Sequence, residues 1–299
     1  MLVPGSMDRE KLAVVKNYCT PDLQIEEVKC DDKTGCIDVA DLKSKLNDSI
    51  GVVYFENPNY FGGLEIGARE IANAAHDAGA QCVVGVDPIS LGVVAVPHSY
   101  GADIVCGDLQ PLGIHMSFGA GLGGYLATRQ EEKYVMNYPH HLHNIFKNSK
   151  GQFGYSRALP ERTSYYVRDK GVEYLGTCVG LWTVTAAVYL ALMGPEGMRE
   201  LGENILYKSN YAQKKLAGLK GVTMPYAGSH SFMEFVLNFD GTGKTVAEIN
   251  KALLAKHIFG GYDLSREMPQ LGQSMLVCVT EKTALSDIDK LADALAEIL

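Results

Sequence analysis

Side chains that could do chemistry directly follow short apolar stretches at three places in the sequence. Asn57 and Asn59 follow one stretch, Asp87 follows a second, and a turn that contains His115 and Met116 follows a third. Short runs of β-branched and aromatic residues that end at Asn, Asp, Pro or Gly are typical of buried strands. Ligands of open parallel sheets bind at the carboxyl ends of the strands. We therefore predict that these side chains lie at the edge of the sheet that carries the site.

The turn at residues 110–118 reads Gln-Pro-Leu-Gly-Ile-His-Met-Ser-Phe. It resembles the turn on which many pyridoxal-phosphate (PLP) enzymes carry their Schiff-base lysine, a turn that often reads His-Lys-Ser/Thr-Phe. Met116 stands at the position of that lysine, and a thioether cannot form an imine. We therefore predict that Met116 is a packing replacement for lysine and that the chain has no catalytic residue of its own for PLP.

The predicted elements alternate between strand and helix. Strands are predicted at 50–55, 81–86, 102–106 and 124–128, and a helix with an apolar stripe at 66–78. Strands separated by helices or by loops of crossover length form a parallel sheet with helices on its faces. The fold class is therefore α/β, with a mostly parallel, partial large domain and a smaller C-terminal α/β domain.

Four segments follow from this pattern. Residues 1–7 resemble a protease-site and cloning remnant, 8–178 form the partial large domain, 179–222 form connecting helices, and 223–299 form the small domain. Weak periodicity from 129 to 171 predicts long loops. In the small domain, alternation over 231–238 predicts a half-buried strand, and Ser286 is predicted to cap the final helix.

Composition argues against several classes of protein. The chain has 299 residues and a formal net charge of −8 without a basic stripe, so nucleic acid and anionic membrane are not expected as partners. No apolar run reaches the roughly 20 residues needed to span a bilayer. The seven cysteines are scattered and contain no Cys-x-x-Cys, which indicates free thiols in a reducing cytoplasm rather than disulfide or metal sites.

Several motifs, in order and spacing, resemble subunit 1 of the two-subunit glycine dehydrogenase (decarboxylating), the α subunit of the glycine cleavage system P-protein. The resemblance covers about the C-terminal two-thirds of that subunit. The motifs are Pro-Asn-Tyr-Phe-Gly at 58–62, Val-Asp-Pro-Ile-Ser-Leu-Gly at 86–92, Tyr-Gly-Ala-Asp-Ile-Val at 100–105, Gln-Pro-Leu-Gly-Ile at 110–114, Ala-Leu-Met-Gly-Pro-Glu-Gly at 191–197 and Val-Thr-Glu-Lys at 279–282.

This resemblance implies a fold similar to the fold-type-I PLP-dependent transferases and a role in glycine catabolism. In the family, a β subunit (subunit 2) carries the PLP lysine, and the assembly is a cytoplasmic heterotetramer. It decarboxylates glycine and passes an aminomethyl group to a lipoyl carrier, the H-protein. The implied role of this chain is that of the non-catalytic half, and it is expected to form a homodimer when alone.

Each candidate site residue can then be interpreted in two ways, as functional or as structural. Asp87 could face the pyridinium nitrogen of PLP and His115 could stack on its ring, but without the lysine both are predicted to be vestigial. Asn57, Asn59 and Arg168 are predicted to line a substrate or interface cleft, although turn chemistry explains the two asparagines equally well.

Other polar residues give weaker signals. Arg157 and Arg162 could each meet a carboxylate or phosphate. The histidines at 140, 141 and 143 are predicted to lie in solvated loops, with no metal site.

The chain departs from the family pattern at 143–146 and 168–177, where partner and substrate contacts are expected. Two alternatives therefore remain open. One is a diverged structural or interaction paralogue without activity. The other is a self-contained PLP lyase or transaminase that uses Lys147, Lys150 or Lys170, none of which follows a predicted strand at the expected turn.

Overall fold

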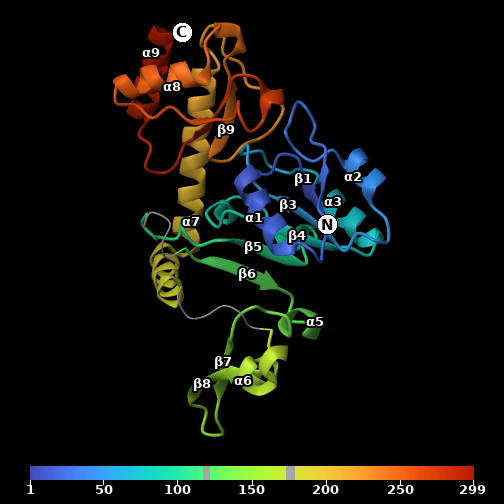
Figure 1. Ribbon diagram of the computed structural model, residues 1–299. Coiled ribbons are helices and arrows are strands. Elements are labelled where there is room, and N and C mark those ends of the chain that lie inside the picture. Colours follow the sequence, from blue (N-terminus) through green and yellow to red (C-terminus); the bar gives the residue numbers. More distant parts are fainter. Residues whose placement is uncertain (117–121, 173–178) are drawn as a thin grey trace. The chain divides into compact units, whose positions relative to one another are not determined.

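A computed structural model describes residues 1–116, 122–172 and 179–299, and the ribbon is drawn in Figure 1. Within these ranges the chain divides into two compact units. The first comprises Met1–Gly107 and Leu190–Leu299, and the second comprises Asp108–Tyr189. This division does not coincide with the predicted boundaries after residues 178 and 222. Ser117, Phe118 and residues 173–177, half of the departure at 168–177, lie outside the described residues.

A parallel sheet forms the amino-terminal part of the first unit. Its strands are β1 (Leu2–Pro4), β2 (Glu26–Val28), β3 (Val52–Glu56), β4 (Gln81–Gly85) and β5 (Ile104–Asp108), in the order β2-β1-β3-β4-β5. All of these neighbours pair in parallel, for example with Val53 opposite Cys82 and Val84 opposite Val105. The predicted parallel sheet is therefore confirmed.

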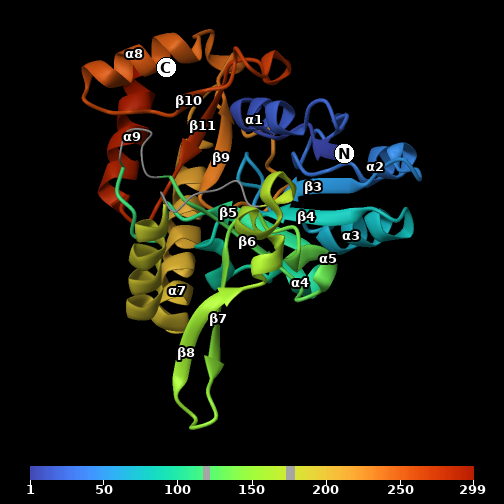
Figure 2. The ribbon, with the colours of Figure 1, turned by 60° about the horizontal axis from the view of Figure 1, so that its bottom comes forward.

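Alternate residues of these strands build two hydrophobic cores, one on each face of the sheet. Val53 and Phe55 of β3 pack with α2 (Val39–Lys45) and α3 (Ala68–Asp77) on one face. Tyr54 packs on the other face with Leu12 of α1 (Arg9–Cys19). Figure 2 shows α1 and α3 on opposite sides of β3 and β4.

Local sequence signals set the limits of these helices. The Asp8 and Asp38 side chains accept hydrogen bonds from amides of the first turns of α1 and α2, which is the usual role of an N-cap aspartate. Gly79 follows α3 in a left-handed conformation (φ +76°). A further short helix, α4 (Pro97–Tyr100), begins at a proline.

Residues 1–7, which resemble a protease-site and cloning remnant, lie within the fold, and this corrects their exclusion from the predicted domains. β1 lies between β2 and β3, and Leu2, Val3 and Met7 are fully buried. Leu2 packs in the core on one face of the sheet, and Val3 and Met7 pack in the core on the other. The segment is therefore part of the parallel sheet.

The helix α7 (Gly180–Leu216) is interrupted at Gly194, where φ is 61° and ψ is −179°. A residue with these angles cannot continue a helix, and the proline that follows lacks an N–H to donate. The predicted break between two helices, with Pro195 opening the second, is therefore confirmed.

The carboxyl-terminal part of the first unit has its own antiparallel sheet. Its strands are β9 (Glu234–Asn238), β10 (Tyr262–Asp263) and β11 (Ser274–Cys278), in the order β10-β11-β9. The helices α8 (Val246–Ala255) and α9 (Leu285–Ile298) pack with it. Thr245 and Glu248 form a capping box at α8, whereas the N-cap of α9 is Ala284, so the prediction of Ser286 was wrong.

β9 is buried on both faces, not half-buried as alternation predicted. Phe235 and Leu237 pack in the core with α8 and α9. Val236 packs on the other face with Phe61, Leu264 and Met268. The polar positions at 234 and 238 produced the alternating pattern, but they end the strand rather than mark a solvent face.

The second unit contains β6 (Gly124–Thr128), α5 (Glu132–Val135), the antiparallel hairpin of β7 (Leu142–Lys147) and β8 (Phe153–Ala158), and the short α6 (Ser164–Val167). The long loops predicted for residues 129–171 are therefore wrong over the hairpin. Polar and aromatic residues on an exposed two-stranded sheet lack the apolar periodicity that identifies buried strands.

Replacing Leu2 by Ala should lower the free energy of unfolding by about 2 to 5 kcal/mol, because it leaves a cavity in a packed core. The exposed Val14 provides the control, since Val14→Ala should change the free energy of unfolding by less than about 0.5 kcal/mol. Urea unfolding followed by circular dichroism measures both. Equal stability of the two variants would contradict the placement of β1 inside the sheet.

Candidate functional site

The carboxyl ends of β3 and β4 lie side by side in the first unit, as the sequence predicted. Asn57 directly follows β3, and Asp87 follows β4 by two residues. Glu56 pairs with Gly85 at the last position of the ladder. The loop that begins at Asn57 and the turn that contains Asp87 therefore leave the sheet from the same edge.

Asn57 and Asn59 do not line a cleft, which corrects the prediction. Both side chains are about 95% buried and bind loop backbone. The Asn59 Oδ1 accepts from the amides of Phe61 (3.1 Å) and Gly63 (2.9 Å), and its Nδ2 donates to the Gly35 carbonyl (3.2 Å). The Asn57 Oδ1 accepts from the Glu65 amide (3.2 Å). The geometry therefore supports the alternative interpretation, in which both asparagines stabilise the turn.

Glu65 is a buried carboxylate that sequence reasoning missed. Both of its carboxylate oxygens accept from the Ile37 amide, at 3.1 and 3.2 Å. Burial raises the pKa of Glu65 to about 7, while bonds from Ile37, Asn59 and Cys36 lower it. A single Glu between apolar residues at 64–66 gives no periodic signal, so burial here could not be read from the sequence.

Asp87 is half-buried, and its Oδ1 accepts from the Ile89 amide at 2.7 Å. Its backbone carbonyl accepts from the Ser90 amide and hydroxyl. These are the bonds of an aspartate that closes a turn after a strand. The negative charge of Asp87 also acts on Glu234 of β9, whose pKa is raised to about 7 mainly by burial and secondarily by Asp87.

Two further carboxylates, those of Glu56 and Glu234, lie near this edge of the sheet. Glu56 is buried, accepts from the Tyr54 hydroxyl at 3.0 Å and forms an ion pair with Lys11 of α1. The Cys278 thiol donates to the Glu234 Oε1 at 3.6 Å. Burial, followed by the charge of Glu234, raises the pKa of this thiol to about 12, so Cys278 is not a thiolate nucleophile at neutral pH.

Met116 is 80% exposed and does not pack as a replacement side chain, which corrects that prediction. The neighbouring His115 is also exposed and makes an edge-on contact with Trp182, with ring centroids 5.9 Å apart. The Gln110 Nε2 shapes the turn by donating to the carbonyls of Ile114 and His115, both at 3.0 Å. The turn is thus built without an amine at residue 116.

The three candidate arginines have different environments. Arg162 is buried, and its guanidinium donates to the carbonyls of Met136 (3.2 Å), His140 (2.8 Å) and Tyr138, so it holds a loop together. Arg157 lies over the Tyr165 ring at 5.1 Å. Arg168 is exposed and has a positive φ of 56°, a conformation that non-glycine residues rarely adopt.

Across residues 1–116, 122–172 and 179–299, no three His, Cys, Asp or Glu side chains are grouped so that they could hold a metal ion. His140 and His141 instead contact each other edge-on, and His141 stacks on Tyr165. His143 lies opposite Arg157 in the hairpin.

The residues present do not fit a covalently bound PLP. Position 116 offers a thioether, and Lys11, the lysine beside the carboxyl edge of β3, is already paired with Glu56. Lys147 and Lys150 lie in the β7–β8 hairpin, and the Lys147 ammonium rests on the Phe153 ring at 5.0 Å. Lys170 lies in a short 3-10 turn. None of these four lysines therefore lies in the turn after β5, where PLP enzymes carry the Schiff-base lysine.

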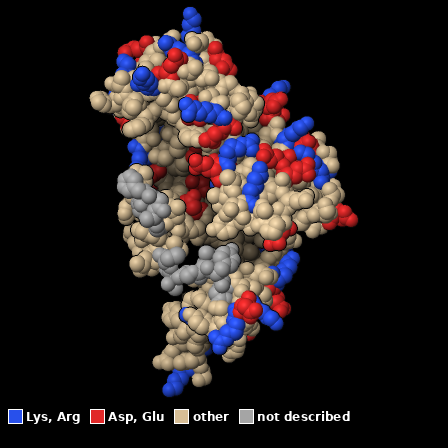
Figure 3. Space-filling view, viewed as in Figure 1, with Lys and Arg blue, Asp and Glu red and all other residues tan. Residues whose placement is uncertain are grey.

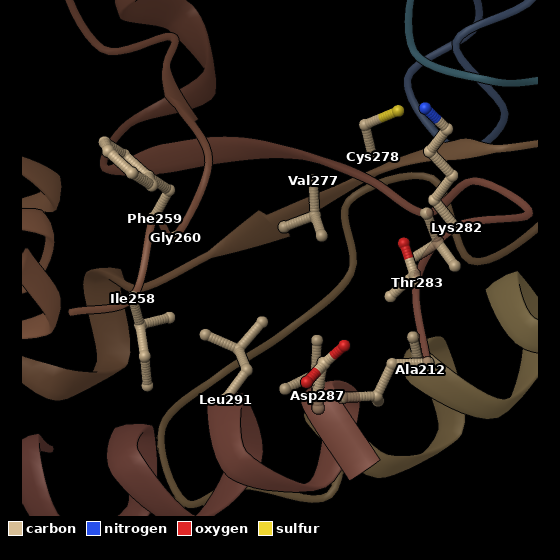
Figure 4. A pocket seen from close by; sticks show the side chains of 13 residues that line it. Ala212, Ile258, Phe259, Gly260, Val277, Cys278, Lys282, Thr283, Asp287 and Leu291 are labelled. Carbon is tan, nitrogen blue, oxygen red and sulfur yellow. The ribbon is translucent and has the colours of Figure 1, made fainter. Parts of the chain in front are cut away.

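A separate cavity of about 350 Å³ lies in the carboxyl-terminal part of the first unit. Figure 4 shows Ile258, Val277 and Leu291 forming its apolar wall, with Cys278 and Lys282 at one end. Its apolar side chains come from α7, β11, α9 and the loop after α8, so it is a hollow in the surface of the small core.

The family is decided by the match of residues 1–295 to the glycine cleavage system P-protein. The chain belongs to this family. Two similar relatives are called probable glycine dehydrogenase (decarboxylating) subunit 1. The relative from Pyrococcus furiosus is 40% identical over 299 residues, and the relative from Staphylothermus marinus is 36% identical over 300 residues. Each alignment covers 100% of this chain, but only 65% and 64% of the relatives' lengths.

Solved structures agree with this family. A glycine decarboxylase (P-protein) of the glycine cleavage system, in inhibitor-bound form, superposes with a TM-score of 0.89 at 30% identity. That comparison covers 100% of this chain and 65% of the solved one. A NifS-like protein from Rickettsia africae has a TM-score of 0.70 at 14% identity, which shows the fold alone. The predicted resemblance and the fold-type-I α/β fold are confirmed.

Replacing Glu65 by Gln should flatten the pH dependence of stability between pH 4.5 and about 7. The folded-state pKa is raised, so the contribution of Glu65 is fully present below its unfolded pKa and is lost as pH rises through about 7. The loss is on the order of 3 kcal/mol, whereas a Gln side chain can still accept from Ile37 without ionising.

Urea unfolding at several pH values measures the free energy of unfolding of wild type and variant. In the difference between them, the contributions of other titrating groups such as Glu234 cancel. Glu200→Gln, a change of an exposed glutamate, is the control and should leave the pH dependence as in the wild type. An unchanged slope in Glu65→Gln would show that Glu65 does not titrate as a buried acid.

Proposed function

We propose that this chain is the non-catalytic subunit of a PLP-dependent glycine decarboxylase of the glycine cleavage system. Membership of the P-protein family supports the reaction class. The observation that carries the non-catalytic role is the methionine at residue 116 in the turn where PLP enzymes have their lysine. The chain spans about 65% of the length of the curated relatives, so the activity of the whole assembly is part of the proposal.

The partner in this proposal is a lysine-bearing subunit 2. The relatives are named subunit 1, which supports a second subunit. PLP would be bound through the partner's lysine and would supply the electron sink for loss of carbon dioxide from glycine. The aminomethyl group would then pass to a lipoyl carrier H-protein, and the assembly would be a cytoplasmic heterotetramer.

An exposed apolar stripe on the first half of α7 supports assembly with another chain. Leu181, Val184 and Val188 follow helical spacing and are each more than half exposed. Large exposed apolar surfaces of soluble chains usually mark interfaces. The same stripe would allow the isolated chain to form a homodimer. Every helix in the described ranges is too short or too polar to cross a bilayer.

The role of this chain is to hold shape and polar groups rather than to supply a nucleophile. Asp87 would bring negative charge to the carboxyl edge of the sheet, where Glu56 is paired with Lys11. The elevated pKa of Glu234 would allow it to hold a proton near neutral pH. Asn57 and Asn59 fix the loop that begins at this edge, so they act as positioning residues.

Glycine decarboxylation should require both subunits. We expect no exchange of the glycine carboxyl group with labelled bicarbonate when either chain is incubated alone with PLP and H-protein, and clear exchange when both are combined. Met116→Leu should leave the exchange rate unchanged because the thioether takes no part in the reaction. Replacement of the partner's PLP lysine by Ala provides the inactive control.

Two results would contradict this proposal. Exchange by this chain alone would identify an independent PLP enzyme. A stable complex of the two chains without exchange would instead support the structural paralogue.

A further inference from the structure

The β7–β8 hairpin has two different faces. One face has Leu142 opposite Ala158, Asn144 opposite Ser156 and Phe146 opposite Gly154. On this face the Ser156 hydroxyl donates to the Asn144 Oδ1 at 2.6 Å, and the Phe146 ring lies over Gly154, where a Cβ would be 2.6 Å from the ring. The side chains of this face therefore contact one another, and its one aromatic residue, Phe146, is 44% exposed.

The second face, which we call the aromatic face, is open. It has His143 opposite Arg157, Ile145 opposite Tyr155 and Lys147 opposite Phe153. Ile145, Phe153 and Tyr155 are 66%, 67% and 77% exposed. Tyr165 of α6, also mostly exposed, continues the apolar surface beyond Arg157, which rests on its ring.

An exposed apolar face of this kind is expected to pack against another protein surface. A two-stranded hairpin is at best marginally stable in water unless a hydrophobic face packs against another element. Within the described residues, Lys147 lies over the Phe153 ring and Arg157 lies over the Tyr165 ring. Exposed aromatic and Arg side chains in a contiguous patch are characteristic of protein interfaces.

The positive charge of the hairpin limits which surface can bind the aromatic face. Residues 142–158 contain Lys147, Lys150 and Arg157 and no Asp or Glu, although the chain as a whole has a net charge of −8. Two basic residues flank the apolar centre of the aromatic face. Figure 3 shows the end of the hairpin, at the bottom as in Figure 1, in tan and blue. Pairing of this face with the same face of a second copy would place like charges together.

We propose that the aromatic face of the β7–β8 hairpin is a docking surface for subunit 2, which presents apolar side chains between carboxylates there. This inference rests on the proposed function, because it assumes the two-subunit assembly. The apolar centre supplies affinity, and Lys147 and Arg157 supply orientation and association rate. The hairpin thus distinguishes the partner subunit from a second copy of this chain.

Binding of the full 299-residue chain to purified subunit 2 by surface plasmon resonance tests the proposal. Ile145→Ser with Tyr155→Ser should weaken binding by roughly tenfold or more, mainly through faster dissociation. Lys147→Glu with Arg157→Glu should slow association and reverse its dependence on salt. Tyr18→Ser and Lys251→Glu are matched controls, since Tyr18 is 78% exposed and Lys251 is an exposed lysine elsewhere, and both should bind as the wild type does.

The outcomes separate the two proposals. If the wild type binds subunit 2 and the folded hairpin variants bind equally well, the docking surface is wrong and the proposed function stands. If the wild type does not bind subunit 2, the assembly itself is wrong. Circular dichroism checks that each variant is folded.

Two further measurements test other occupants of the aromatic face. Sedimentation of the chain alone should be the same for wild type and hairpin variants, and a loss of homodimer in the variants would assign the face to a second copy. Vesicles of phosphatidylglycerol and phosphatidylcholine should not bind the wild type. Vesicle binding that the hairpin variants lose would assign the face to a membrane.

Discussion

A close contact between two backbones joins the parallel sheet to the carboxyl-terminal sheet in the first unit. Gly62 has a φ of +82°, and a Cβ there would lie 1.9 Å from the Glu234 carbonyl oxygen. The Phe232 amide donates to the Gly62 carbonyl at 2.8 Å, and Gly63 forms a bridge with Ser231. Only glycine allows this approach. The contact depends on the loop after β3, which the Asn59 side chain holds in place.

This contact accounts for the chemistry at the edge of the sheet. It brings the start of β9 to the carboxyl ends of β3 and β4, so that Glu234 acquires a raised pKa from burial and from Asp87. The same loop buries Glu65 against Ile37. The polar groups at this edge are therefore largely used by the fold itself, which is compatible with the non-catalytic role that we propose.

The sequence predicted the parallel sheet, the break at Gly194 and the strand ends at Asn57 and Asp87, because local periodicity and turn residues determine these features. The predictions failed at residues whose burial is determined by tertiary contacts. Leu2 and Val3 are core residues only because β2 and β3 flank them, and Asn59 is buried only because the loop folds around it. The hairpin was missed because its exposed face carries aromatic residues that a free loop could also carry. The burial of Glu65 and Glu234, and hence their raised pKa values, could not be predicted because both depend on the three-dimensional environment.

In the proposed role, this chain holds no Schiff-base lysine. Incubation of the pure chain with PLP, a scan for the absorption band of lysine-bound cofactor, and borohydride reduction followed by peptide mapping test it most directly. We expect no stoichiometric band and only diffuse labelling of surface lysines. A stoichiometric band with the label on one lysine would contradict the account and would identify this chain as an enzyme in its own right.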